Sequence, residues 1–232
     1  MNDFNLNDFQ TEYNQKIELL KKKISAKKSF DEGIQLALDI HALTHSSVVS
    51  SSNCFTFFDT IISNLEESDY SVMPKETDET IAWHIWHITR IEDMVGNILI
   101  NSKEQIFCKE LQKKMNAIAT DTGNAFSDEM IIDFSKTIDK KELLSYRDMV
   151  GKRGREIIAS LSYDEIKGKA SKENLERLLP LGCLTEEKDS IWLKDFWGRL
   201  TIGGMLCLPL TRHHMMHLPD SFRIMKYLHP DN

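Results

Sequence analysis

The amino-acid sequence predicts an all-α protein, a bundle of four long helices with additional peripheral helices. Apolar residues recur mainly at helical spacing, and the 232 residues include only five prolines and ten glycines, which leaves little turn material for a many-stranded sheet. The chain shows no internal repeat, low-complexity tract or clear linker. We therefore expect a single domain over residues 1–232, with a charged helical leader at 1–30 and the bundle at 31–230.

The first helices are expected at residues 8–28 and 31–67. The segment 8–28 is amphipathic and ends in a cluster of lysines that is typical of a solvated face. Asp31 is a plausible N-cap for the second pattern, and Pro74 closes that stretch. The serine-rich middle, HSSVVSSSN, predicts a kink or short break. The expected apolar anchors of this pattern are Leu36, Ile40, Leu43, Phe55, Phe58, Ile62 and Leu65.

The remaining helices follow the same logic. A helix with one apolar stripe is expected at residues 78–101, with Thr77 or Asp78 as its cap. A helix near 103–120, the loop DTGN and a short helix from Ser127 come next. A long pattern then runs from Asp139 to residue 161. The last expected elements are a shorter helix within 163–184, which ends in a Pro180/Gly182 turn, and an element at 190–228 that is interrupted by Gly203-Gly204, Pro209 and Pro219.

Charge and composition exclude several classes of protein. The net charge of −7 disfavours a duplex-DNA binder that relies on phosphate contacts. No apolar run approaches the roughly 20 residues of a membrane span, and the first 30 residues are too polar for a signal peptide. We therefore expect a cytoplasmic protein without a nucleic-acid or membrane partner. The scattered cysteines predict neither disulfides nor a catalytic thiol, and we expect small buried hydrophobic residues at Cys54, Cys108, Cys183 and Cys207.

Seven of the eight histidines fall in three helical clusters: His41 and His45; His84 and His87; and His213, His214 and His217. Positions four apart lie on nearly the same helix face, so His213 and His217 can direct two imidazoles at one metal ion. Either His84 or His87 can supply a third. Spacing alone leaves open the alternative that these are buried, hydrogen-bonded histidines. A ferritin-like di-iron site is disfavoured because no histidine has a glutamate three residues before it.

Two segments carry a more specific signal, TIAWHIWHITRIEDM at 80–94 and FWGRLTIGGMLCLPLTRHHMMHL at 196–218. Together with DTGNAF and YRDMVGKRGREI, they resemble the DinB/YfiT-like superfamily of four-helix-bundle proteins. The resemblance implies that His87, His213 and His217 hold a divalent metal, zinc or nickel with iron or manganese as alternatives. It makes His84 and His214 neighbours of the ligands and assigns no role to His41 and His45. The sequence departs from an HRGQ-type run seen around the last ligand in small family members.

This resemblance implies a metal-dependent enzyme, either a transferase that uses a low-molecular-weight thiol such as bacillithiol or mycothiol, or a hydrolase. It also implies a small-molecule substrate and a homodimer. The alternative is a non-catalytic bundle protein, metal-stabilised or metal-free, that acts through protein interactions.

Other residues near the histidines have simpler expected roles. Glu92 lies about 140° around the helix from His87 and should not reach the same metal. Glu92 and Asp93 are expected to balance surface charge or to pair with Arg90 rather than to act directly. Trp83 and Trp86 are expected to pack the core or to line a pocket. Arg212 has two open alternatives, binding of an anionic substrate group or a salt bridge on the helix surface. Pro219 is expected either to kink or to stop the last helix after His217.

Overall fold

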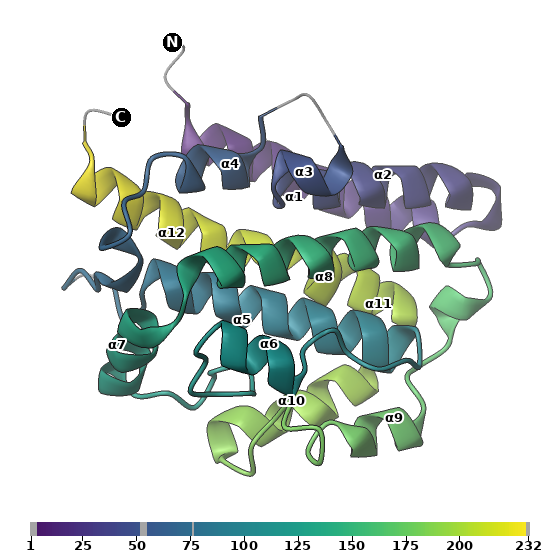
Figure 1. Cartoon of the computed structure of the whole chain (residues 1–232). Helices are drawn as coiled ribbons and strands as arrows, with labels where there is room; N and C mark the ends of the chain where they lie inside the picture. The colour runs from purple at the N-terminus through teal and green to yellow at the C-terminus, as the bar shows by residue number, and fades with distance from the viewer. Residues whose placement is uncertain (1–3, 52–54, 76, 231–232) are drawn as a thin grey trace.

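Helices make up the framework of the computed structural model, which describes residues 4–51, 55–75 and 77–230 (Figure 1). The described part contains no strand, only one isolated bridge between Lys169 and Thr201, and confirms the all-α prediction. The longer elements are α1 (Leu6–Ile24), α2 (Phe30–Leu43), α5 (Ile81–Asp93) with its π-helical continuation η3 (Met94–Ile100), α8 (Lys140–Ser160) and α12 (His214–Leu228). The shorter elements are α3 (Ser47–Ser50), α4 (Phe57–Ile62), α6 (Lys109–Lys114), α7 (Asp128–Thr137), α9 (Lys172–Arg177), α10 (Lys188–Arg199), α11 (Ile202–Cys207) and the π-helical η5 (Leu208–Arg212).

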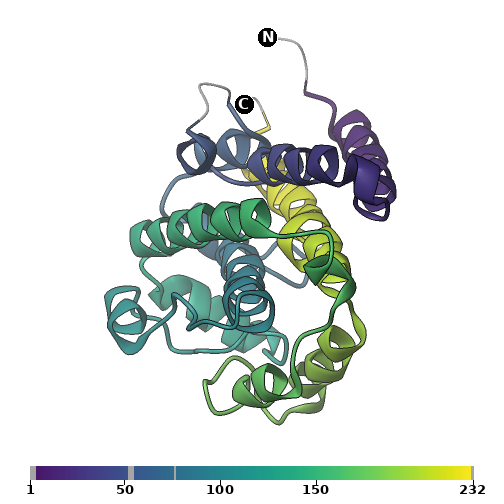
Figure 2. The same cartoon turned by 90° about the vertical axis from the view of Figure 1, so that its right-hand side faces the viewer.

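The long helices pack in a continuous series. The helix α1 lies along α2, α2 packs on α8, α8 packs on α5, and α5 contacts α12 (Figures 1 and 2). The charged leader is therefore part of the packed structure. Its apolar residues recur at helical spacing and are buried: Tyr13, Ile17, Leu20 and Ile24.

Sequence signals located some helix ends correctly. Ser127 caps α7, and Asp139 caps α8 with a carboxylate that accepts from the Glu142 amide. The expected break in 31–67 separates α2, α3 and α4. The expected cap of α5 was wrong, because Thr80 accepts from the Trp83 amide and the helix begins at Ile81 rather than after Thr77 or Asp78.

Other expectations for these elements need correction. Asp31 is not the cap of α2, since Phe30 already begins that helix. Phe55 is not an apolar anchor: it precedes Thr56, the N-cap of α4, and is 68% exposed. The helix expected near 103–120 is reduced to α6. In the last element, the chain breaks before the two glycines, at the Thr201 cap of α11, and Pro219 lies inside α12 without ending it.

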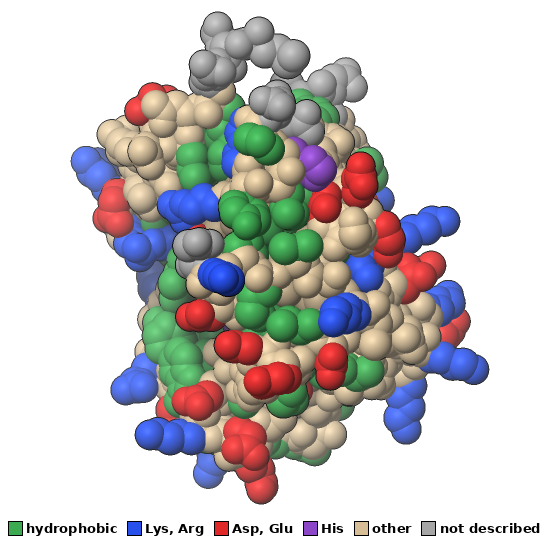
Figure 3. Space-filling model, turned by 90° about the vertical axis from the view of Figure 1, so that its left-hand side faces the viewer, with side chains coloured by type: hydrophobic (Ala, Val, Ile, Leu, Met, Phe, Trp, Pro, Cys, Tyr) green, Lys and Arg blue, Asp and Glu red, His purple; other side chains and the backbone are tan. Residues whose placement is uncertain are grey.

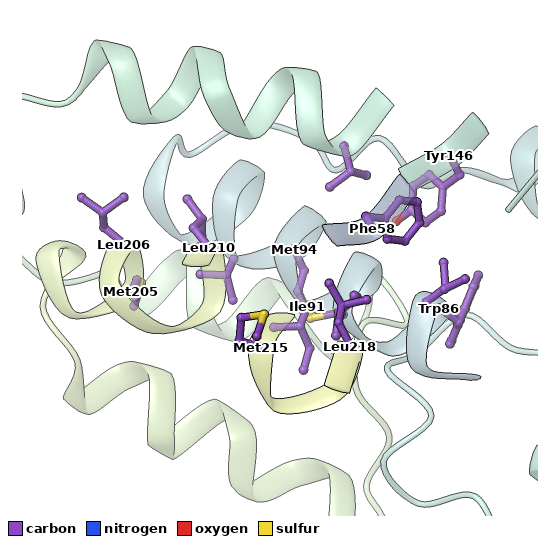
Figure 4. Close-up of a cluster of buried hydrophobic side chains, with 14 of the residues drawn as sticks. Phe58, Trp86, Ile91, Met94, Tyr146, Met205, Leu206, Leu210, Met215 and Leu218 are labelled. Carbon is purple, nitrogen blue, oxygen red and sulfur yellow. The ribbon is translucent and has the colours of Figure 1, made fainter. Parts of the chain in front are cut away.

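The helix α5 lies at the centre of the core. Every residue from Ile81 to Asp93 is buried, so the core-facing surface extends beyond the predicted apolar stripe to the whole helix, which α7, α8 and α12 surround. Figure 4 shows part of this core, in which Trp86 and Ile91 lie among side chains of the neighbouring elements, including Tyr146, Met215 and Leu218. No helix of the described chain combines the length and the apolarity that crossing a bilayer requires.

A buried carboxylate at the end of α5 ties this core together. Asp93 is fully buried and accepts hydrogen bonds from the Tyr146 hydroxyl at 2.6 Å and from the amides of Ile106 and Phe107 at 2.8 Å. Of the two roles left open for Asp93, the structure shows the pairing with Arg90, at 3.3 Å, and not surface charge, because both side chains are buried. The network joins α5, α8 and the segment before α6.

We expect the Asp93→Ala variant to lose about 3–5 kcal/mol of unfolding free energy, because it removes the carboxylate that pairs with the buried Arg90 guanidinium and that accepts from two amides. Urea denaturation followed by circular dichroism measures this loss. Asp164→Ala removes an exposed ion pair with Lys167 and should leave the midpoint unchanged. Equal midpoints for both variants would show that the Asp93 network adds nothing to stability.

Candidate metal centre

Three consecutive carbonyls of the 121–124 loop fix one face of α5. Asp121 O accepts from Trp86 Nε1 at 3.0 Å, Thr122 O lies 2.9 Å from His87 Nδ1, and Gly123 O accepts from Trp83 Nε1 at 3.1 Å. Gly123 has a φ of +74°, and a Cβ there would lie 2.8 Å from the Trp83 indole nitrogen, so only glycine fits. Since a carbonyl only accepts, the proton of His87 resides on Nδ1 and its Nε2 is left free to bind a metal.

The other two histidines lie where η5 meets α12. His213 directly follows the π-helical turn, and His217 is one turn further along α12. Their Nε2 atoms are 3.2 Å apart. Donor atoms on a tetrahedral zinc ion with bonds of about 2.0–2.1 Å are roughly 3.3–3.4 Å apart, so this separation suits two ligands of one ion.

The structure brings all three predicted ligands together. His87, His213 and His217 each offer a ligand atom, and these atoms lie within 4.8 Å of one another. The ring centroid of His87 is 5.1 Å from that of His213 and 4.6 Å from that of His217. The structure therefore contains a group of three histidines that can hold a metal ion.

His84 and His214 are both close to this group but face different partners. His84 Nδ1 lies 3.2 Å from Nδ1 of His217, which makes it a neighbour that orients this ring. His214 points away, toward Glu92. Sequence reasoning did not find the roles of His84 and Thr122, since a contact between distant segments and a backbone acceptor leave no local signal.

The imidazoles of the three-histidine group, and that of the neighbouring His84, are neutral at physiological pH. Burial lowers the pKa of His87 to about 4 and that of His84 to about 3. Burial, together with neighbouring imidazoles, also holds the pKa of His213 and of His217 well below the usual value. Neutral imidazole is the form that binds metals.

A pocket of about 460 Å³ opens beside the three histidines. The Trp83 ring stacks on His87 with centroids 4.7 Å apart, and it forms part of the pocket wall. The described lining residues include no lysine or arginine. The aromatic lining residues are Trp83, Phe126, Trp192, Phe196 and Trp197, and the acidic ones are Asp78, Glu79 and Asp128.

Several other sequence-based expectations are settled by this arrangement. Trp86 packs in the core, and Glu92 faces away from the three histidines, as predicted. Arg212 does not line the histidine pocket; it lies at a separate pocket with Tyr163 and Cys207.

The cysteine expectation holds in part. Cys183 and Cys207 are buried, whereas Cys108 is exposed and corrects the expectation for that residue. Cys108 immediately precedes α6, whose described residues are not buried. Cys54 lies outside the described residues.

The sequence was compared with known proteins. A family model described as the DinB superfamily matches residues 58–218. The match includes His87, His213 and His217 and excludes α1 and α2. A comparison with curated proteins gives no match.

Proposed function

Because this chain belongs to the DinB superfamily, we propose that it is a metal-dependent enzyme in which His87, His213 and His217 hold a divalent ion. We propose zinc or nickel as this ion and a thiol-dependent transfer to a small molecule as the reaction, with hydrolysis as the other reaction the site can support. The observation that supports this most directly is the convergence of three neutral imidazoles at one side of a pocket.

The donor set fits such an ion. Three imidazole nitrogens suit zinc and nickel better than magnesium or calcium, which prefer oxygen ligands. A three-nitrogen site that faces a pocket also leaves coordination positions open, as catalytic sites do. When bound, the ion supplies Lewis acidity and lowers the pKa of a thiol or water that it binds.

The protein's own residues hold and shape this site. The Thr122 carbonyl fixes the tautomer of His87, and His84 orients His217. The aromatic side chains give the pocket beside the imidazoles apolar walls, which suit the apolar body of a substrate. In the transfer, the sulfur forms a bond to an electrophilic carbon, the leaving group departs with the electron pair of the broken bond, and the thiol proton passes to solvent.

The charge of the pocket favours an uncharged or cationic substrate with an apolar body. Three carboxylates and no lysine or arginine are among the described lining residues. Burial and the charges of Asp78, Asp220 and Asp128 raise the pKa of Glu79, as expected where carboxylates crowd together. Acidic side chains also lie among exposed hydrophobic ones over the lower half of the face in Figure 3.

A turnover screen tests the proposal. Protein purified without a histidine tag and loaded with zinc or nickel is assayed with thiols and an aryl halide or epoxide. We expect turnover with cationic cysteamine to exceed that with anionic 3-mercaptopropionate. We expect His213→Ala to lose turnover and the ion at the pocket-facing site, with the metal affinity of that site falling by more than the roughly 10–100-fold that loss of an outer-shell partner costs.

His229→Ala is the matched control, because His229 pairs with Asp69 away from this site and should leave metal content and turnover unchanged. Metal retained without any turnover would favour the non-catalytic bundle. Absence of metal after reconstitution would contradict the proposed site itself.

A further inference from the structure

A second cluster of histidines is buried between α2, α5 and α12, and the proposed function does not use it. It consists of His41, His45, His214 and Glu92, whose side chains are no more than 1% exposed. The rings of His41 and His45 stack, with centroids 4.0 Å apart and planes 16° apart. The family match begins after both of these residues.

The Nε2 atoms of the three imidazoles surround one carboxylate. His41 Nε2 is 2.8 Å from Glu92 Oε1, and the Nε2 atoms of His45 and His214 are 3.1 and 3.2 Å from Glu92 Oε2. Ligand atoms of His41, His45 and Glu92 lie within 4.8 Å of one another. The distances of 3.1 and 3.2 Å from His45 and His214 to Glu92 Oε2 are close to the roughly 3.3 Å between donors on a tetrahedral zinc ion.

Three of these atoms lack a hydrogen-bond partner within the described ranges, although they face one another. They are His45 Nε2, His214 Nε2 and Glu92 Oε2. The contacts are therefore short without the alignment of a hydrogen bond. A buried polar atom without a partner costs about 1–3 kcal/mol, and a single cation between these atoms would satisfy all three.

Thr44 supplies an independent argument from protonation. Its hydroxyl donates to the His41 carbonyl at 3.2 Å and lies 3.0 Å from His214 Nδ1. A hydroxyl has one proton, so when it donates to that carbonyl it accepts from His214 Nδ1. His214 Nε2 then directs a lone pair at the Glu92 carboxylate, an arrangement that a cation between the two atoms stabilises.

Two glycines of α8 make room for the cluster. A Cβ at Gly151 would lie 2.5 Å from His45 Nδ1, and one at Gly154 would lie 2.5 Å from Glu92 Oε1. Arg147, also on α8, is 3.9 Å from Glu92 Oε2 and is engaged by Thr44 O and Thr89 Oγ1. Because this guanidinium already brings a positive charge, the ion must be one that imidazoles bind strongly, such as zinc, rather than magnesium or calcium.

We propose that His41, His45, His214 and Glu92 form a second, structural site for an imidazole-binding divalent ion such as zinc. His41, His45 and Glu92 supply three ligand atoms within 4.8 Å of one another, and His214 adds a fourth donor through its 3.2 Å contact with Glu92 Oε2. Four protein donors with full burial are typical of a closed structural site, whereas the three-histidine group faces a pocket. The adjacent residues His213 and His214 supply one ligand to each site, because consecutive helical positions point in directions about 100° apart. The second site would link α2, α5 and α12.

The His213→Ala/His217→Ala variant tests this site alone, because it removes the pocket-facing ligands and keeps the buried cluster intact. The tag-free protein is produced in zinc-supplemented medium, washed with a chelator and analysed by mass spectrometry of metals. We expect about one zinc ion per chain in this variant and about two in the unmodified protein. Adding His45→Gln to the double variant should remove the remaining ion and the rise in Tm that zinc produces.

His229→Ala, outside both clusters, should retain both ions. A folded double variant that holds no zinc, with a Tm that does not respond to zinc, would overturn the second site in favour of a metal-free hydrogen-bonded cluster. If that variant does not fold, zinc content of the unmodified protein decides, since only one ion per chain would equally overturn the proposal. The two proposals are tested separately, because the zinc content of the double variant reports on the buried cluster alone, and the turnover of His213→Ala reports on the pocket-facing site.

Discussion

Zinc binding at the pocket-facing site should weaken far more in the His217→Ala variant than in the His84→Phe variant. His217 places its Nε2 atom 3.2 Å from that of His213, so its removal takes away one of three proposed ligands. His84 contacts only the far nitrogen of His217, at 3.2 Å. Loss of such an outer-shell partner costs about 10–100-fold in metal affinity, and we expect loss of the ligand to exceed that range.

Competition with a chromophoric zinc chelator measures both affinities. Zinc bound beside the open pocket should exchange quickly, which separates it from an ion held in the buried cluster. His229→Ala serves as the control and should bind zinc as the unmodified protein does. Equal affinities for His217→Ala and His84→Phe would contradict the assignment of His217 as a ligand and His84 as its orienting neighbour.

The sequence predicts the pair His213 and His217 well, because one helical turn of spacing is enough to place two side chains together. The third proposed ligand, His87, needed the family resemblance. The helix α5 is buried on all sides, so it has no polar face from which to decide whether His84 or His87 directs a free nitrogen at the shared site. That choice depends on the carbonyl of Thr122, 35 residues away in the sequence.

The buried cluster shows a limit of sequence reasoning. His41 and His45 have the same four-residue spacing as His213 and His217, which was the available signal. Their carboxylate partner could not be predicted, since Glu92 belongs to a different helix and meets them only through tertiary packing. The space that this packing needs beside α8 depends on Gly151 and Gly154, where a Cβ would lie 2.5 Å from His45 Nδ1 and from Glu92 Oε1.

Helix starts that depend on local sequence were predicted, and one that involves a tertiary contact was not. Asp139 precedes a clear apolar pattern and caps α8 as predicted. Before α5, several residues can cap a helix, and Thr80 was missed. Its hydroxyl is 2.6 Å from that of Ser135, a tertiary contact that accompanies its role as the cap.

The metal-free protein should lose stability steeply as the pH falls below about 6.5. Burial lowers the pKa of both His87 and His214 to about 4. Their pKa in the unfolded chain is about 6.5, so the unfolded state binds more protons between these two values and acid favours it. The stabilisation is present above about pH 6.5 and is lost as the pH falls toward 4. The same direction holds for His45, His84, His213 and His217.

Each such histidine contributes up to about 1.4 kcal/mol per pH unit, so the group together changes stability by several kcal/mol per unit. Urea unfolding of chelator-treated protein at a series of pH values measures the slope. His84→Phe removes one titrating group and should make the slope shallower by about one proton. This change distinguishes the contribution of the histidines to the pH dependence from that of the carboxylates. A midpoint that does not change between about pH 7 and 5 would mean that the folded protein accepts these protons as readily as the unfolded chain. The imidazoles would then not be the desolvated, neutral donors that both proposed metal sites require.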